Sequence, residues 1–158
     1  MNRPIDVPIV VLSLLAWLAL SVATAQDAGP GDLMALPALW EARYNEGDLD
    51  GLAALYTEAA TLMPPDAPEA HGRDAVRAHT QGYLDAGAAR AEISSLMDYG
   101  VLGDEAWGAG TYRFFSDAGD PVAVGKFLIV YRRVGDAWSI ARHIWNRDVA
   151  PSAPPSAN

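Results

Sequence analysis

Apolar residues in the first half of the chain recur at the three- and four-residue spacing of helices. The pattern predicts helices that begin at Leu36-Pro37, at Leu49 and at Gly72. Asn45-Glu46-Gly47 closes the first of these helices, Asp48 is suited to cap the second, and Gly87 closes the third. A strand that ends at Pro64-Pro65 is expected between the second helix and the third.

From Ala89 onward the apolar residues alternate instead, as in half-buried strands. Turn-forming residues at 103–104, 117–120 and 135–136 divide this part into four antiparallel strands in a meander. One strand places Gly108, Gly110, Tyr112 and Phe114 on a single face, and the last strand does the same with His143 and Trp145. The two glycines are expected to leave open space on that face.

The two ends of the chain differ in composition from this central part. Residues 1–25 combine Arg3, an apolar run over 9–20 and the small residues Ala23-Thr24-Ala25, which is typical of a cleaved secretory signal peptide. A run of that length reaches only ~18 Å as a helix, against ~30 Å for the hydrocarbon core, so a retained membrane anchor is the weaker alternative. We therefore expect a periplasmic or secreted protein with one domain over 26–149 and a disordered tail over 150–158.

Charge and cysteine content narrow the classes of function. The formal net charge of −9 argues against binding to nucleic acid or to an anionic membrane surface, since both need a basic face. The chain has no cysteine, which excludes disulfides and thiol chemistry.

The segments 44–48, 62–65, 72–76, 110–112, 125–127 and 144–146 follow one another in an order and spacing that resemble the NTF2-like superfamily, in its SnoaL-like and DUF4440 branch related to ketosteroid isomerases. The resemblance covers about residues 33 to 149. It implies an α+β cone in which three N-terminal helices pack on a strongly curved, mainly antiparallel sheet. It also implies a pocket inside the cone and a homodimer formed through the convex face of the sheet.

The resemblance does not carry over the isomerases' catalytic groups. Those enzymes use a carboxylate, a tyrosine and a protonated aspartic acid. The corresponding positions here hold Pro64, Trp40 and a residue near Leu128. Proline and leucine have no proton to exchange, so steroid-type isomerisation by that apparatus is not expected.

Residues that the resemblance places around the pocket are mostly aromatic, as expected of a small-molecule site or, alternatively, of a filled core. His79 and His143 are the candidate catalytic residues, because an imidazole can exchange protons near neutral pH. No metal site and no cofactor are predicted, since too few ligand-type residues are available and no nucleotide-binding motif occurs. The other candidate pocket residues are Trp40, Tyr44, Met63, Tyr83, Tyr112, Phe114, Lys126, Leu128, Trp145 and Asn146.

Three functions remain open from the sequence. The first is an exported binding domain for a small, largely apolar ligand with a polar or anionic group. The second is an isomerase, lyase or cyclase that uses His79 or His143 as a base and Tyr112 or Lys126 to stabilise an oxyanion. The third is a structural dimerisation module whose cone is filled by its own side chains.

Overall fold

The computed structural model describes residues 30–148, which form three helices and seven strands. The predicted signal peptide and tail, 1–25 and 150–158, lie outside these residues. The elements in chain order are α1 Pro30–Glu46, α2 Leu49–Ala54, β1 Tyr56–Met63, β2 Ala70–His71, α3 Gly72–Asp85, β3 Arg90–Ile93, β4 Asp98–Leu102, β5 Glu105–Phe115, β6 Pro121–Val134 and β7 Ala137–Arg147.

The junction between α1 and α2 has the predicted geometry. Gly47 has a φ of 69°, a left-handed conformation that ends a helix at little cost for glycine. The Asp48 carboxylate then accepts a hydrogen bond of 2.8 Å from the Gly51 backbone N–H, as an N-cap residue does. Asp48 also accepts a bond from Arg43 at 3.0 Å, which ties the two helices together.

The first helix begins earlier than the sequence indicated. It starts at Pro30 rather than at Leu36-Pro37, and Pro37 lies inside it. Proline inside a helix removes one backbone hydrogen bond. Burial of Leu33 and Leu36 in the core on the preceding turn holds the helix together through this point.

The strands form one sheet in the order β2-β1-β7-β6-β5-β3, with β4 also paired to β5. All pairs are antiparallel except β1 with β7, which lie parallel. The predicted meander needs one correction, because its first strand is two strands. The segment 94–97 interrupts the pairing, so that β3 and β4 pair with different halves of β5.

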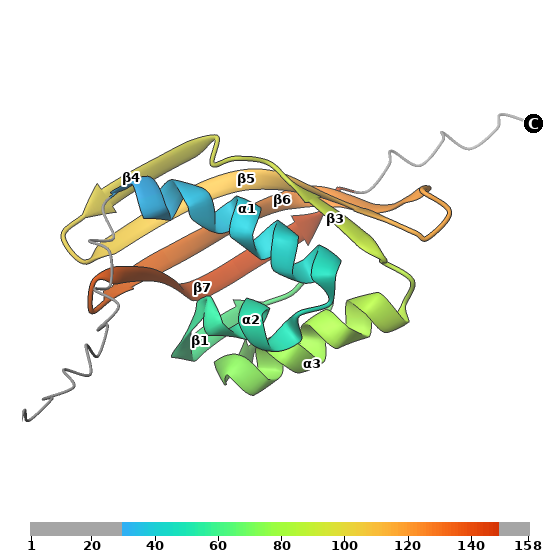
Figure 1. The fold of residues 1–158 in the computed structure, drawn as a ribbon, viewed down its shortest axis with the longest axis horizontal. Coiled ribbons are helices and arrows are strands. Elements are labelled where there is room, and N and C mark those ends of the chain that lie inside the picture. Colours follow the sequence, from blue (N-terminus) through green and yellow to red (C-terminus); the bar gives the residue numbers. More distant parts are fainter. Residues whose placement is uncertain (1–29, 149–158) are drawn as a thin grey trace, which may run out of the picture.

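The three helices cover one face of the curved sheet, with α1 crossing in front of it and α3 running beside β1 (Figure 1). The predicted α+β fold is confirmed. The core between these layers contains several aromatic side chains, and its largest fully buried members are Tyr44, Tyr56, Tyr131, Leu33, Leu52, Ile140 and Val76.

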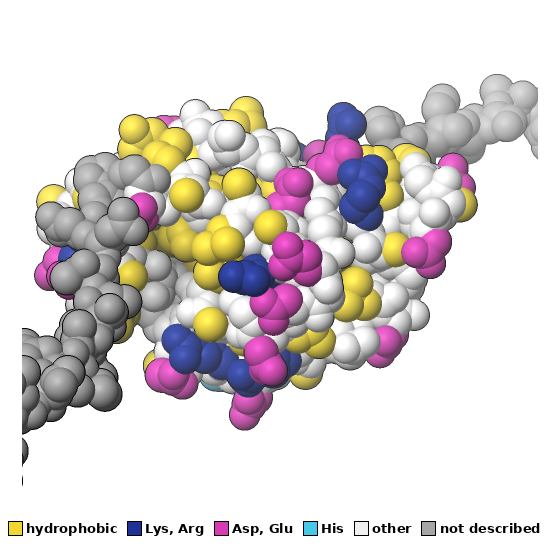
Figure 2. Space-filling view, in the orientation of Figure 1, with side chains coloured by type: hydrophobic (Ala, Val, Ile, Leu, Met, Phe, Trp, Pro, Cys, Tyr) yellow, Lys and Arg dark blue, Asp and Glu magenta, His cyan; other side chains and the backbone are white. Residues whose placement is uncertain are grey.

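On the helical face, the basic side chains lie next to acidic ones (Figure 2). Arg73 pairs with Glu58, and Arg77 pairs with Asp50 and Asp74. These exposed pairs contribute little to stability individually, and the face offers no continuous basic surface. No helix among residues 30–148 is long and apolar enough to cross a membrane.

Candidate functional site

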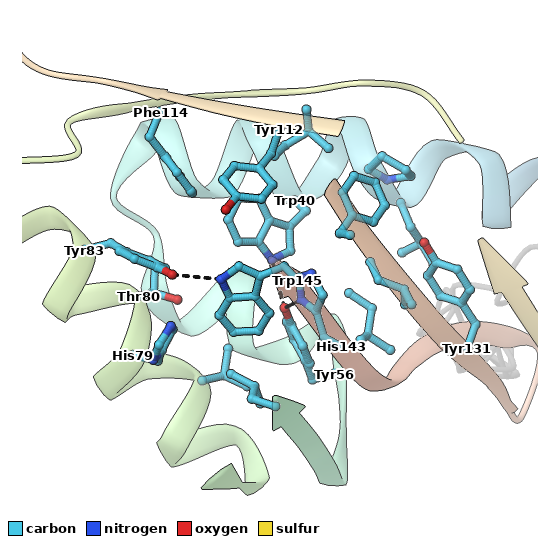
Figure 3. Close-up of a pocket in the computed structure, with 18 residues that line it drawn as sticks. Trp40, Tyr56, His79, Thr80, Tyr83, Tyr112, Phe114, Tyr131, His143 and Trp145 are labelled. Atoms are coloured by element: carbon cyan, nitrogen blue, oxygen red, sulfur yellow. Dashed lines mark hydrogen bonds between the residues drawn. The ribbon is translucent and has the colours of Figure 1, made fainter. Parts of the chain in front are cut away.

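A cavity of about 50 Å³ lies between the helices and the concave face of the sheet (Figure 3). Helices α1 and α3 form one side, and strands β1, β3, β5, β6 and β7 form the rest. Among residues 30–148, none of the side chains around it is acidic, and none is lysine or arginine. The lining residues are Leu36, Pro37, Trp40, Tyr56, Leu62, Val76, His79, Thr80, Tyr83, Ile93, Tyr112, Phe114, Phe127, Ile129, Tyr131, Ile140, His143 and Trp145.

Tyr56 connects two other polar groups at the cavity wall. Its hydroxyl accepts a hydrogen bond of 3.0 Å from the Trp40 indole N–H and lies 2.8 Å from Nδ1 of His143. Because His143 is the acceptor available to it, the Tyr56 hydroxyl donates its proton to Nδ1. Neutral His143 therefore carries its own proton on Nε2, which makes that nitrogen a donor.

Trp145 lies between the two candidate histidines. Its ring centre is 5.1 Å from that of His79 and 4.8 Å from that of His143. Its indole N–H donates a bond of 2.8 Å to the Tyr83 hydroxyl, which fixes the orientation of the indole (Figure 3). The two imidazoles are thus separated by an aromatic ring.

Both histidines are neutral at physiological pH for the same physical reason. Burial, together with the smaller effect of the nearby His79, lowers the pKa of His143 to about 3. Burial also lowers the pKa of His79. A charged imidazole would be poorly solvated in this apolar environment, so the site presents neutral hydrogen-bonding groups.

Two fully buried polar atoms of residues that line the cavity have no hydrogen-bond partner among residues 30–148. They are Nε2 of His79 and the hydroxyl oxygen of Tyr131, and both atoms are buried. Buried polar atoms in folded proteins almost always have partners. These two atoms are therefore candidates for contact with a bound molecule, as is the Nε2 donor of His143.

Seven of the predicted site residues come together around this cavity. Helices α1 and α3 supply three of them at helical spacing, and the inward faces of β5 and β7 supply four. They are Trp40, His79, Tyr83, Tyr112, Phe114, His143 and Trp145.

Lys126 and Leu128 face away from the cavity, and their predicted orientation is wrong. Lys126 is exposed and pairs with Asp148, and Leu128 is 43% exposed. The register of β6 is one residue from the expected one, and such a shift moves every side chain to the other face. Phe127 and Ile129 take the inward positions.

Three further predicted residues lie near the cavity without lining it. Tyr44 is buried behind it, where its hydroxyl donates a 2.6 Å bond to the Ala88 carbonyl. Asn146 is exposed and contributes only its backbone carbonyl, which accepts a 3.0 Å bond from Tyr112. Met63 is half-buried at the end of β1.

The space expected beside Gly108 and Gly110 is occupied. A methyl group added at Gly108 would lie 2.7 Å from Leu96, and one added at Gly110 would lie 2.5 Å from Phe127. The glycines let these side chains pack closely against the strand. Leu96 and Phe127 therefore fill the space that the sequence predicted to be open.

Sequence reasoning missed Tyr56 and Tyr131. Tyr131 shares a face of β6 with Phe127 and Ile129, but the opposite face is also apolar, so alternation alone does not show which face is buried. Tyr56 directly follows Leu55, the C-cap residue of α2. It occupies the first position of β1, where periodicity gives no information about orientation.

The family model for the SnoaL-like domain matches residues 38–143 of the chain. The chain belongs to the SnoaL-like family. This assignment, together with the fold, confirms the resemblance to NTF2-like proteins. No match to this SnoaL-like chain is found among proteins with curated functions.

Solved structures similar to this SnoaL-like chain share its fold. A protein of unknown function from Mycobacterium tuberculosis has a TM-score of 0.68 at 24% identity, over 81% of this chain and 76% of that one. An NTF2-like protein with a cystatin-like fold from Novosphingobium aromaticivorans has a TM-score of 0.66 at 20% identity, with coverages of 73% and 79%. A ketosteroid isomerase-like protein from Erwinia carotovora atroseptica has a TM-score of 0.61 at 20% identity, with coverages of 76% and 96%.

Proposed function

We propose that this SnoaL-like domain binds one small, neutral, largely apolar molecule whose polar group forms a hydrogen bond with Nε2 of His79. The observation that carries the proposal is the buried, unpartnered Nε2 at a cavity whose lining is largely apolar and aromatic. A ligand that supplies the missing hydrogen bond would remove the cost of this unsatisfied group.

The ligand is expected to be neutral because no charged side chain from the described part of the chain lines the cavity. Burying an unpaired carboxylate among these aromatic rings would cost far more than burying a hydroxyl or a carbonyl. The exposed position of Lys126 removes the anion anchor that the sequence offered. The anionic ligand considered from the sequence is therefore not part of the proposal.

The ligand is also expected to be small. A cavity of about 50 Å³ is well below the ~150 Å³ of an engineered apolar cavity that binds benzene. Molecules of four or five non-hydrogen atoms are the best first probes. A larger ligand would require the Trp145 or Tyr83 side chain to move.

Binding is favoured over base catalysis by the hydrogen bonds of His143. The Tyr56 hydroxyl occupies Nδ1, and Nε2 carries a proton, so neither nitrogen is free to accept one. Among the described residues, an isomerase or lyase would have only the His79 imidazole as a base, since none of them places a carboxylate at the cavity.

The test is an NMR titration of the full chain with cyclobutanol and, separately, with acetate. We expect cyclobutanol to shift the resonances of residues that line the cavity and to bind in the millimolar range, and acetate to leave them unchanged. His79→Leu should weaken cyclobutanol binding about three- to tenfold, the amount expected for one neutral hydrogen bond. If acetate binds in the cavity and cyclobutanol does not, the proposal is wrong.

Two neighbouring residues of β6 provide a matched control. Ile129 faces the cavity, whereas Leu128 faces outward. Ile129→Phe fills the cavity and should abolish the cyclobutanol shifts, while Leu128→Phe should retain them. Equal binding by both variants would place the ligand outside the cavity.

A further inference from the structure

Tyr131 is a fully buried tyrosine near the C-terminal end of β6. Its side chain is 0% exposed, and its hydroxyl has no hydrogen-bond partner among the described residues. Its partners in the sheet are Ala106 and Ile140, whose side chains are apolar. Figure 3 shows Tyr131 and His79 at opposite ends of the group of side chains that line the cavity.

The other tyrosines around the cavity differ from Tyr131 in this respect. The hydroxyl groups of Tyr44, Tyr56, Tyr83 and Tyr112 each take part in a hydrogen bond within the protein. Phenylalanine at position 131 would provide the same packing without an unsatisfied group. The Tyr131 hydroxyl, like the Trp138 indole N–H outside the cavity, has no partner within residues 30–148, so any partner it has comes from outside these residues.

The chemistry of the missing partner follows from the state of the phenol. Burial raises the pKa of Tyr131 well above its usual value, so the group stays protonated and can donate. Its natural partner is an acceptor without a charge, such as a carbonyl or ether oxygen. This requirement differs from that of His79, whose neutral imidazole can accept or donate through Nε2 according to its tautomer.

We propose that Tyr131 is a second anchor of the site, meaning a residue that forms a hydrogen bond with the ligand. Its hydroxyl donates to an oxygen acceptor of the same molecule that forms a hydrogen bond with His79. The ligand is then a short molecule with polar groups at both ends and an apolar middle, as in a small hydroxyketone. The inference rests on the proposed function and adds the class of ligand to it. It assigns specificity to a residue that the sequence pattern did not single out.

The first experiment compares two probes of the same shape, cyclobutanone and methylenecyclobutane, which differ only in the acceptor oxygen. Tyr131→Phe in the full chain should weaken binding of cyclobutanone about three- to tenfold. The same variant should leave the dissociation constant of methylenecyclobutane unchanged within about twofold, since the hydrocarbon makes no hydrogen bond that the variant removes. NMR titration measures both constants.

The second experiment uses 3-hydroxycyclobutanone, which carries both polar groups. It should bind the wild-type chain more tightly than cyclobutanone does, and His79→Leu should remove that advantage. Loss of affinity in both Tyr131→Phe and His79→Leu would show that one molecule meets both anchors.

The failures of the two proposals are distinguishable. If both cyclic probes bind and Tyr131→Phe affects neither, the second anchor is wrong, ordered water being then the partner of the hydroxyl, and the binding function stands. If none of these probes binds the wild-type chain, the binding function fails and the second anchor falls with it.

The stability of the unliganded chain gives an independent measurement. Tyr131→Phe removes an unsatisfied hydroxyl and should raise the melting temperature by about 2–6 °C. A fall in melting temperature would show that the hydroxyl already has a partner in the free protein, and this result would overturn the proposal.

Discussion

Tyr56 holds together the polar groups on one wall of the cavity. Its hydroxyl receives the Trp40 N–H and donates to His143, so a single oxygen atom satisfies groups from α1 and β7. The tyrosine itself is 2% exposed. Removal of this oxygen leaves two buried groups without partners, which is the opposite of the situation at Tyr131.

We expect Tyr56→Phe to lower the free energy of unfolding by about 1–3 kcal/mol, the usual cost of leaving buried polar groups unpaired. Urea denaturation monitored by circular dichroism measures this free energy of unfolding. Tyr131→Phe is the matched control, because it removes the same atom from the same residue type and is expected to stabilise. Equal effects of the two substitutions would contradict our assignment of the hydrogen bonds.

His143 should make stability depend on pH below neutrality. Its pKa is about 3 in the folded chain and about 6.5 when unfolded, so between these values the unfolded state binds more protons. Stability is then complete above pH 6.5 and decreases as the pH falls towards 3. The slope from this residue is at most about 1.4 kcal/mol per pH unit.

His143→Asn tests this dependence, since asparagine offers Tyr56 an acceptor but does not titrate. Urea midpoints measured from pH 7 to pH 4.5 should fall less steeply for the variant than for the wild-type chain. Identical slopes would show that His143 is not the group responsible.

Among the elements, β6 shows most clearly why part of the site could not be read from the sequence. Its outward positions hold Val124, Leu128 and Val130, and its inward positions hold Phe127, Ile129 and Tyr131. With apolar residues on both faces, alternation cannot decide which face is buried. Lys126 was therefore predicted to face the cavity. In the structure its charged side chain lies on the exposed outer face of the sheet.

Elements with one apolar face were predicted with better success. Trp40, His79 and Tyr83 reach the cavity as the resemblance implied, and the exposed face of α3 carries the polar residues Asp74, Gln81 and Asp85. Tyr112 and Phe114 followed from the alternation in β5. No periodicity reveals that the Tyr131 hydroxyl lacks a hydrogen-bond partner among the described residues, because this depends on the three-dimensional positions of the other polar groups.

The contact between β6 and β7 leads to a prediction at Gly125. A methyl group there would lie 1.9 Å from the Asn146 carbonyl oxygen and 2.7 Å from the Tyr112 ring. Gly125→Ala should therefore destabilise the chain by more than about 2 kcal/mol and disturb the cavity wall, because backbone must move to relieve the overlap. Thermal unfolding and the NMR spectrum of the variant measure the two effects.

Gly82→Ala is the control for this substitution. Gly82 lies inside α3 with nothing within 4 Å of the added methyl group. Alanine should stabilise the helix there by about 0.5–1 kcal/mol. A destabilising effect at both sites would point to a general sensitivity to substitution rather than to the close approach of β6 and β7.

For the whole molecule, the outer face of the sheet is the expected site of contact with a second copy. Trp107, Leu128 and Ile144 are 41–43% exposed on β5, β6 and β7. Leu128 pairs with Ile144 in the sheet, so these two side chains are neighbours. The net charge of −9 disfavours association in general, but Lys126 and Arg132 lie on this face with their acidic partners and reduce the local repulsion.

If the chain forms a dimer through this face, Leu128→Glu should convert it to a monomer at micromolar concentration, since two buried carboxylates would face each other's apolar surface. Light scattering after size-exclusion chromatography measures the mass. Leu39→Glu, on an exposed site of α1, is the control and should leave the mass unchanged. If the wild-type chain is monomeric at all concentrations measured, the prediction of a dimer is wrong.

The parallel pairing of β1 with β7 also determines when the cavity can exist. It joins Tyr56 to Ile140 and Leu62 to His143, across most of the described chain. Contacts between such distant segments form slowly, because closing the long intervening loop costs entropy before the contacts can offset it. The final strand brings His143 and Trp145, so a nascent or partly folded chain has no closed site. Any molecule that the cavity holds is therefore captured after folding and cannot guide its early steps.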